Sequence, residues 1–201
     1  GAYDFIEKPF SAQALAGVLR HALDRRSLVL ENRRLKAVAG IATRFLDDVH
    51  DISLLPLKAQ EKAVRASRRI GLGVTGLADA LLMLGLRYGS VEAAAQTEAW
   101  MKAIARASYL ASVDLAKEKG AFPLFDAEAY LASGTMMQMD EDVRAEIRTH
   151  GIRNALLNSI APTGTISLLA DNVSSGIEPV FAFSYVRHVL QPDGSKREES
   201  V

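Results

Sequence analysis

The chain has 201 residues, and its 24 lysines and arginines balance 24 aspartates and glutamates, so that the formal net charge at pH 7 is zero. This balance argues against nucleic acid or a membrane surface as partner, because both attract proteins with an excess of basic residues. The absence of cysteine excludes disulfides, thiolate metal sites and any mechanism that uses a protein thiyl radical or a thiol pair.

No apolar run reaches 18 residues, and the amino end lacks the basic-then-apolar layout of a signal peptide. We therefore expect a cytoplasmic protein. The chain begins with Gly1 and not with methionine, so we also expect it to be a piece of something larger.

Helical periodicity dominates residues 11–151. Ser11 is expected to cap a helix that runs to about residue 35, where Leu28 and Leu35 share a stripe too short to establish a coiled coil. The pattern after residue 41 predicts a helix with Phe45, Leu46 and Val49 directed inward. Further helices are expected over 58–70, 78–84, 90–119 and 140–150, of which 58–70 is charged and exposed and 78–84 is apolar almost all round and therefore buried.

The ends of two of these helices carry recognisable signals. Ser90 is a suitable N-cap for the long helix over 90–119, and Gly120 is a suitable terminator. Gly151 is expected to lie just beyond the end of the helix over 140–150.

The sequence changes period toward its carboxyl end. Residues 152–160 alternate loosely enough to predict a half-buried strand, and residues 180–201 predict a β-hairpin that turns at Pro192-Asp193-Gly194. The predicted fold class is therefore mixed α/β, mainly helical, with a small sheet at the carboxyl end.

The spacing Gly71-x-Gly73-x-x-Gly76 is that of a dinucleotide-binding fingerprint. Such a fingerprint needs a strand directly before it, and the preceding "EKAVRASRR" is too charged and too helical for a central parallel strand. We favour the interpretation that these glycines allow close packing at the start of the next helix.

The stretch "NSIAPTGTISLLADNVSSGIEP" is a better candidate for binding phosphate. Pro162 fixes a turn after the expected strand, Gly164 permits an unusual backbone conformation, and Thr165 begins a short helix. The backbone N–H groups of such a turn point outward and Thr163, Thr165 and Ser167 add hydroxyl donors, an arrangement that suits a phosphate. The alternative is that Thr165 is an ordinary N-cap and that residues 172–176 are an ordinary loop.

Four blocks of residues 41–201 resemble the ribonucleotide reductase large chain, and are most similar to its adenosylcobalamin-dependent class. The blocks are "ATRFLDDVHDIS", "RRIGLGVTGLADALLMLGLRYGS", "YLASVDLAKEKGAFPLFD" and "NSIAPTGTISLLADNVSSGIEPVFAFSY", in the order of the family. The resemblance implies part of a ten-stranded α/β barrel. It also implies that Pro162, Thr163, Gly164, Thr165 and Ile166 hold the phosphates of a ribonucleoside diphosphate or triphosphate.

The same resemblance implies chemistry that this chain does not carry. The family uses a cysteine that becomes a thiyl radical, two further cysteines, and an asparagine and a glutamate on a finger loop, all before the point where the resemblance begins. We therefore assign no catalytic residue and no metal ligand, and we expect no bound cofactor, although adenosylcobalamin is the cofactor of the parent family. His50 stands where the family is usually aliphatic, and we interpret it as a surface or hydrogen-bonded residue.

Residues 1–36 resemble the last strand and helix of a bacterial response-regulator receiver domain, followed by a linker helix, with Lys8-Pro9 matching the receiver's Lys-Pro. We therefore divide the chain into a receiver-derived segment, 1–38, and a partial reductase barrel, 41–201. Such a chimera could arise by gene splicing or mis-assembly, by recombination or by deliberate engineering.

Two functions follow from these resemblances. The first is an enzyme fragment that retains the substrate-phosphate turn and is inactive alone. The second is a non-enzymatic interaction module in which the helix that contains Leu28 and Leu35 associates with a partner. A severed barrel exposes strand edges and apolar helix faces, so we also expect self-association through these surfaces.

Overall fold

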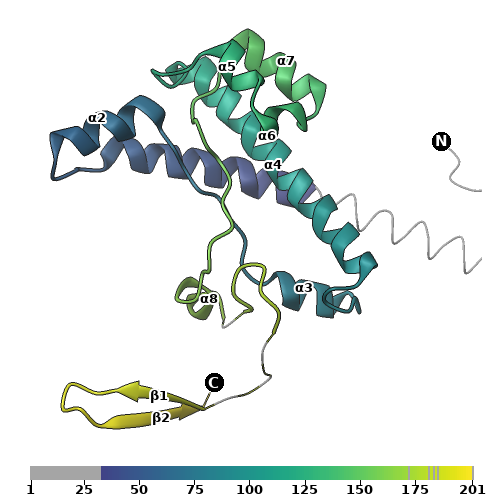
Figure 1. Cartoon of the computed structure of the whole chain (residues 1–201), viewed down its shortest axis with the longest axis vertical. Helices are drawn as coiled ribbons and strands as arrows, with labels where there is room; N and C mark the ends of the chain where they lie inside the picture. The colour runs from purple at the N-terminus through teal and green to yellow at the C-terminus, as the bar shows by residue number, and fades with distance from the viewer. Residues whose placement is uncertain (1–32, 172, 181, 183, 185, 201) are drawn as a thin grey trace, which may run out of the picture. The chain divides into compact units, whose positions relative to one another are not determined.

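A computed structural model describes residues 33–171, 173–180, 182, 184 and 186–200 of the chain (Figure 1). The described residues form two compact units: unit 1 contains 33–72 and 98–159, and unit 2 contains 73–97 and the described part of 160–200. The expected helix that starts after Ser11 and the receiver-like Lys8 lie outside the described residues. The receiver resemblance stays a prediction.

Unit 1 is built of helices. Its elements are a helix that covers residues 33–52, α2 (Lys58–Ser67), the carboxyl part of α4 (Val91–Lys119), α5 (Ala127–Leu131), α6 (Gly134–Met137) and α7 (Glu141–His150). One apolar cluster holds these elements together, and its buried members are Ile70, Tyr109, Val113, Phe122, Leu131, Met136, Val143, Ile147, Ile152 and Leu157. The core of unit 1 therefore draws on α4, α5, α6 and α7 and on the extended segments that contain Ile70, Phe122 and residues 152–157.

The predicted helix ends are confirmed. The Ser90 hydroxyl accepts a hydrogen bond from the Ala93 N–H at 3.1 Å, as an N-cap of α4 should. Gly120 and Gly151 follow α4 and α7 with φ of +85° and +72°, in the region that glycine adopts without strain.

The helix over residues 33–52 corrects our prediction of its buried face. Phe45 and Val49, expected to point inward, are 64% and 37% exposed, whereas Thr43 and Asp47 are completely buried. Leu46 packs against the core cluster as predicted, but apolar periodicity missed the burial of Thr43 and Asp47, whose polar side chains find hydrogen-bonding partners inside unit 1.

The strand expected over 152–160 is only an extended segment. It pairs in parallel with residues 70–72 through one bridge, between Leu72 and Asn158, and the N–H of Ile70 donates to the Leu156 carbonyl oxygen at 2.9 Å. Within the described residues this pair gains no third strand, so it does not become a sheet. The ten-stranded barrel stays a prediction.

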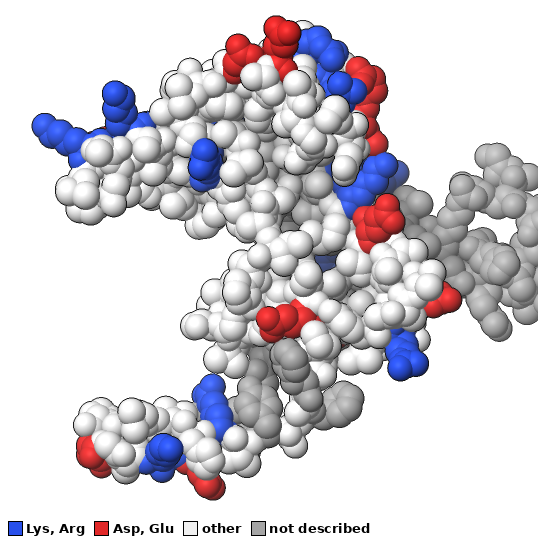
Figure 2. Space-filling model, viewed as in Figure 1, with Lys and Arg blue, Asp and Glu red and all other residues white. Residues whose placement is uncertain are grey.

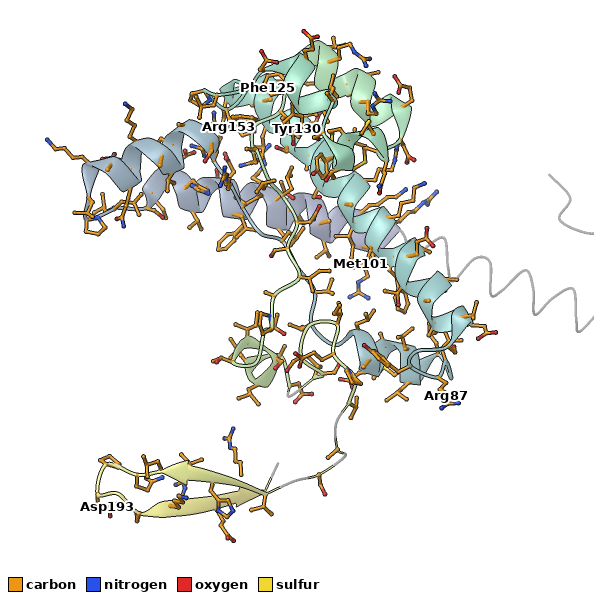
Figure 3. The ribbon with its side chains drawn as sticks, in the orientation of Figure 1. Arg87, Met101, Phe125, Tyr130, Arg153 and Asp193 are labelled. Carbon is orange, nitrogen blue, oxygen red and sulfur yellow. The ribbon has the colours of Figure 1, made fainter. Side chains whose placement is uncertain are left out.

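Unit 2 contains α3 (Leu77–Met83), α8 (Ile166–Leu169), and the strands β1 (Val186–Leu190) and β2 (Lys196–Ser200). The predicted hairpin is confirmed, since β1 and β2 pair antiparallel with Val186 opposite Ser200 and Leu190 opposite Lys196. Asp193 shapes its turn by accepting hydrogen bonds from both the N–H and the hydroxyl of Ser195, and Figure 3 labels it at the hairpin's tip.

The helix predicted as fully buried, now α3, buries only one face. Leu77 and Leu81 are buried, whereas Leu82 is 46% exposed and Met83 is 87% exposed. The described part of unit 2 offers too few neighbouring elements to cover a helix that is apolar all round.

Candidate functional site

The turn predicted to hold phosphate lies in unit 2, directly before α8. The short helix expected here is present and begins one residue later than predicted: Thr165 is its N-cap residue, as in the alternative interpretation, and Ile166 its first residue. Ser167 N–H donates to the Thr163 carbonyl oxygen at 2.9 Å, which closes the turn into the helix. Pro162, Gly164, Thr165 and Ile166 are exposed and Thr163 is half-buried, so the turn is open to a ligand.

The unusual backbone conformation falls on Thr163 and not on Gly164. Thr163 has a φ of +54°, a value that a β-branched residue rarely adopts. Our assignment of that conformation to Gly164 is therefore wrong. The Thr163 Oγ1 accepts a hydrogen bond from the Gly176 N–H at 2.6 Å. This hydrogen bond stabilises Thr163 in its strained backbone conformation. Backbone strain of this kind is often found at binding sites.

The turn requires a glycine at position 176. A Cβ atom at this position would lie 2.6 Å from the Ala161 carbonyl oxygen, and its φ is +47°. Only glycine fits both the conformation and the close approach. Residues 161–163 and 176 therefore form one rigid backbone crossing, which the sequence did not reveal because Gly176 lies 12 residues beyond Gly164.

The turn offers hydrogen-bond donors that are not already used. Within the part of the chain that the structure describes, the N–H groups of Gly164 and Thr165 have no acceptor. Both residues are exposed, so a ligand oxygen can reach these groups. Donors in adjacent positions favour an anion with several oxygens, such as a phosphate.

A hollow of about 150 Å³ lies beside the turn in unit 2, lined by Gly164 and Ser167 and, on the other side, by Asp79 and Ser174. Asp79 Oδ2 accepts a hydrogen bond from the Ser174 N–H at 2.8 Å, and the Asp79 N–H donates to Ser174 Oγ at 3.3 Å. The carboxylate disfavours a phosphate deep in the hollow. The outward N–H groups of the turn are therefore the better position for one.

A second polar constellation, missed by the sequence analysis, lies in unit 1 around the buried Asp47. Its Oδ1 accepts from Arg68 Nη2 at 2.6 Å, from Arg68 Nε at 2.9 Å and from Asn154 Nδ2 at 3.0 Å. Asn154 Oδ1 accepts in turn from Ser112 Oγ at 2.8 Å. The helix over 33–52, the end of α2, α4 and the segment after α7 thus meet at one carboxylate.

Further cations approach the same carboxylate. Arg153 Nε and Lys119 Nζ each lie 3.4 Å from Asp47 Oδ2, and Arg153 also donates to the carbonyl oxygens of Lys119 and Gly120. Figure 3 labels Arg153 on the segment that follows α7. Burial of Asp47 opposes its ionisation, but the hydrogen bonds from Arg68 and Asn154 outweigh burial and lower its pKa.

Asp47, Asp48 and Asp51 place carboxylate oxygens within 4.8 Å of one another, a spacing that a metal ion could use. Cationic side chains already form ion pairs with these carboxylates. Lys119 Nζ lies 2.6 Å from Asp48 and 3.1 Å from Asp51, and Arg68 lies 2.8 Å from Asp51. We therefore interpret the cluster as an ion-pair network that joins structural elements.

Two smaller predictions concern single residues. His50 Nε2 donates to the Arg69 carbonyl oxygen at 2.7 Å, which confirms that it is a hydrogen-bonded residue. A Cβ at Gly71 would lie 2.8 Å from Ser159 Oγ, and one at Gly76 would lie 3.3 Å from Val173 Cβ. These contacts confirm close packing at Gly71 and Gly76.

Charged side chains of both signs are scattered over the largely uncharged face that Figure 2 shows, without a continuous basic surface. An example is Arg106, which pairs with Asp140 at 3.0 Å and also with Asp142. Among the described residues, no helix is long and apolar enough to cross a membrane.

Comparison with known proteins gives the family. The sequence model described as "Ribonucleotide reductase, barrel domain" matches residues 15–198. The chain belongs to this ribonucleotide reductase family. The match begins inside the segment that we assigned to a receiver domain, and the boundary at 38–41 stays a prediction.

Individual reductases are similar over most of this chain. A vitamin B12-dependent ribonucleoside-diphosphate reductase of Mycobacterium tuberculosis is 44% identical over 157 residues, which are 78% of this chain and 20% of the relative. The enzyme of the same name from Thermoplasma acidophilum is 42% identical over 78% of this chain and 18% of its own length. The reductase subunit alpha of Chlamydia muridarum is 34% identical over 86% of this chain and 18% of its own length.

The chain therefore spans about a fifth of the length of these relatives. The vitamin B12 dependence in the names of two relatives confirms the cofactor that we expected for the parent family.

Proposed function

We propose that this chain is the part of a ribonucleotide reductase that holds the substrate's phosphates at Pro162–Ile166, and that it does not reduce nucleotides by itself. The observation that carries the proposal is the turn, where the N–H groups of Gly164 and Thr165 are exposed and without an acceptor among the described residues. Family membership supplies the ligand class, because the relatives are named ribonucleoside-diphosphate reductases.

Binding follows from the turn's own groups. The N–H groups of Gly164 and Thr165 donate to phosphate oxygens, and the Thr165 hydroxyl adds a third donor from the N-cap position. Thr163 Oγ1 is fixed by the Gly176 N–H, so the turn keeps its conformation when the ligand is absent. Little ordering is then required when a diphosphate binds.

Catalysis needs groups that this chain does not contain. In the parent family vitamin B12 supplies the radical, and the resemblance implies that the radical passes to a cysteine thiol. The chain contains no cysteine, so its residues do not fit that role and no chemical step is assigned to them. Nucleotide reduction would require the remaining four fifths of a reductase.

The binding half of the proposal is tested by calorimetry with cytidine diphosphate and with inorganic pyrophosphate. Ile166 is 57% exposed in the first turn of α8, so Ile166→Asp puts a negative charge beside the turn without removing core contacts. We expect this change to weaken binding at least about tenfold, the effect of losing roughly 1.4 kcal/mol. Leu190→Asp, at a 69% exposed position on β1, is the matched control and should leave binding unchanged.

If neither ligand binds, or if both variants bind like the unaltered chain, the turn does not hold phosphate. The catalytic half has a separate test, in which the chain is incubated with a ribonucleoside diphosphate, adenosylcobalamin and a dithiol. We expect no deoxynucleotide above background. Product formed by this chain would contradict the argument from its missing cysteines.

A further inference from the structure

The helix α3 begins without a cap from its own sequence. Its N-cap residue is Gly76, which has no side chain to accept hydrogen bonds from the first turn, although the first N–H groups of a helix need acceptors. A distant segment of unit 2 supplies them. The Ser174 carbonyl oxygen accepts from the Gly76 N–H at 2.7 Å, and the Gly176 carbonyl oxygen accepts from the Leu77 N–H at 3.5 Å. We name residues 174–176 the capping segment.

Asp79 and Ser174 complete this cap by exchanging two hydrogen bonds. The Asp79 N–H donates to Ser174 Oγ at 3.3 Å, and the Ser174 N–H donates to Asp79 Oδ2 at 2.8 Å. This is the pattern of a capping box, in which the N-cap hydroxyl and the side chain three residues later satisfy each other's N–H groups. Here the hydroxyl comes from a residue 95 positions further along the chain, because Gly76 has none. Ser174 therefore ties the capping segment to α3.

The capping segment also contacts the phosphate turn and the helix that follows it. The Gly176 N–H donates to Thr163 Oγ1 at 2.6 Å, and the hydroxyl oxygens of Ser175 and Ser167 lie 3.4 Å apart. Ser167 Oγ in turn donates to the Gly164 carbonyl oxygen at 3.2 Å. The capping segment therefore joins the start of α3 to the turn through a continuous set of hydrogen bonds.

Gly76 allows the capping segment to approach α3 this closely. Its φ is +74°, in the region that glycine adopts without strain. A Cβ at this position would lie 3.3 Å from the Cβ of Val173, the residue directly before the capping segment. The last glycine of the fingerprint spacing thus connects that spacing with the phosphate turn.

We propose that Asp79 and Ser174 are positioning residues for the phosphate turn. They hold the capping segment at the start of α3, and Gly176 of that segment holds Thr163 in its strained conformation. Neither Asp79 nor Ser174 is required to touch the ligand. The inference rests on the proposed function for its ligand, whereas the link between α3 and the turn is present in the chain without one.

Two substitutions of Asp79 that differ little in size separate positioning from charge. Asp79→Asn keeps a side-chain oxygen that accepts from the Ser174 N–H, whereas Asp79→Leu has none, and both remove the negative charge from the hollow. Charge alone predicts that both variants bind inorganic pyrophosphate more tightly. Positioning predicts that Asp79→Leu binds it at least about tenfold more weakly in calorimetry, because the Ser174 N–H loses its acceptor. Asp79→Asn should bind pyrophosphate at least as tightly as the unaltered chain.

Amide hydrogen exchange followed by NMR tests the link without a ligand. We expect Asp79→Leu to speed exchange of the Ser167 and Gly176 N–H groups, which both donate to Thr163. Asp79→Asn should leave this exchange unchanged. Ser174→Ala removes the hydroxyl and keeps the backbone N–H, so it should speed the same exchange by less than Asp79→Leu does. Exchange in α7 of unit 1 should be the same in every variant.

Glu92 provides the matched control in unit 2. It is an exposed acid in the first turn of α4, as Asp79 is in the first turn of α3, and it hydrogen-bonds to Ser90 and to its own backbone. Glu92→Leu should therefore change neither pyrophosphate binding nor the exchange of the Ser167 and Gly176 N–H groups.

Equal pyrophosphate binding by Asp79→Leu and Asp79→Asn would overturn the proposal, and so would exchange at Ser167 and Gly176 that Asp79→Leu leaves unchanged. Faster exchange at the start of α4 as well would show that Asp79→Leu loosens unit 2 in general, which contradicts a positioning role. If the unaltered chain binds no pyrophosphate, the proposed function fails, and the exchange measurement alone decides whether α3 holds the turn.

Discussion

Unit 1 and unit 2 are stabilised in different ways. The ten buried residues of the main apolar cluster all belong to unit 1, together with the buried carboxylate of Asp47 and its partners. In the described part of unit 2, the buried apolar residues are Leu77, Ala78, Leu81 and Ala93. Unit 2 depends more on backbone hydrogen bonds and on particular backbone conformations than on a core.

The difference in core size agrees with what each unit presents at its surface. A large core with a buried ion pair supports a rigid scaffold. Unit 2 presents an exposed turn with unused N–H groups, and binding segments are commonly drawn from the less stable parts of a protein. Substitutions in unit 1 should therefore act first on stability, whereas substitutions in unit 2 should act on the turn.

The largest effect is expected from Asp47→Asn in unit 1. The change leaves the Arg68 guanidinium, whose side chain is 5% exposed, without its main counter-charge. Breaking one partner of a buried pair costs about 3–5 kcal/mol, and Asp51 compensates only in part. Urea unfolding followed by circular dichroism measures the loss.

Asp48→Asn is the matched control for this substitution. Its side chain is 53% exposed and it pairs with Lys119 at the surface, so its removal should cost less than about 1 kcal/mol. Equal effects of the two substitutions would show that the Asp47 network does not hold unit 1 together.

Acid should reproduce part of the Asp47 effect. The pKa of Asp47 is lowered in the folded chain because hydrogen bonds from Arg68 and Asn154 outweigh burial. Its contribution to stability is therefore fully present above the unfolded pKa of about 3.9, and is lost as the pH falls through the lower folded value. Urea midpoints measured between neutral pH and the acid range should fall less for Asp47→Asn than for the unaltered chain. Parallel pH curves for the two chains would contradict this origin.

The sequence predicted the parts of the fold that depend on local signals. Ser90, Gly120 and Gly151 marked helix ends because their side chains, or the lack of one, act within a few residues. The hairpin turn at Asp193 was predictable for the same reason.

The parts that sequence reasoning missed depend on distant partners. Asp47 is buried because Arg68 and Asn154, 21 and 107 positions away along the chain, reach it, and no periodicity of apolar residues records that. The turn expected at residues 162–166 is present, but its strained residue is Thr163 and not Gly164. Thr163 keeps its conformation through Gly176, 13 positions further on, so a local reading assigned the strain to Gly164.

A stability effect smaller than that of Asp47→Asn is expected in unit 2, from Gly176→Ala. The new Cβ would lie 2.6 Å from the Ala161 carbonyl oxygen at a φ of +47°, so the backbone crossing must shift. We expect a cost of about 1–3 kcal/mol, confined to unit 2 because the core cluster lies elsewhere. Hydrogen exchange resolved by mass spectrometry should show faster exchange around residues 161–176 and unchanged exchange in α4 and α7.

Gly164→Ala is the matched control for Gly176→Ala, because it adds a methyl group without straining the backbone. Nothing lies within 4 Å of a Cβ at Gly164, and its φ is outside the positive region, so hydrogen exchange should stay as in the unaltered chain. Since Gly176→Ala moves the Thr163 hydroxyl's partner, it should also weaken diphosphate binding, although residue 176 itself need not touch the ligand. Weakened binding with unchanged exchange around 161–176 would instead mean that Gly176 contacts the phosphate directly, and that the crossing is not what shapes the turn.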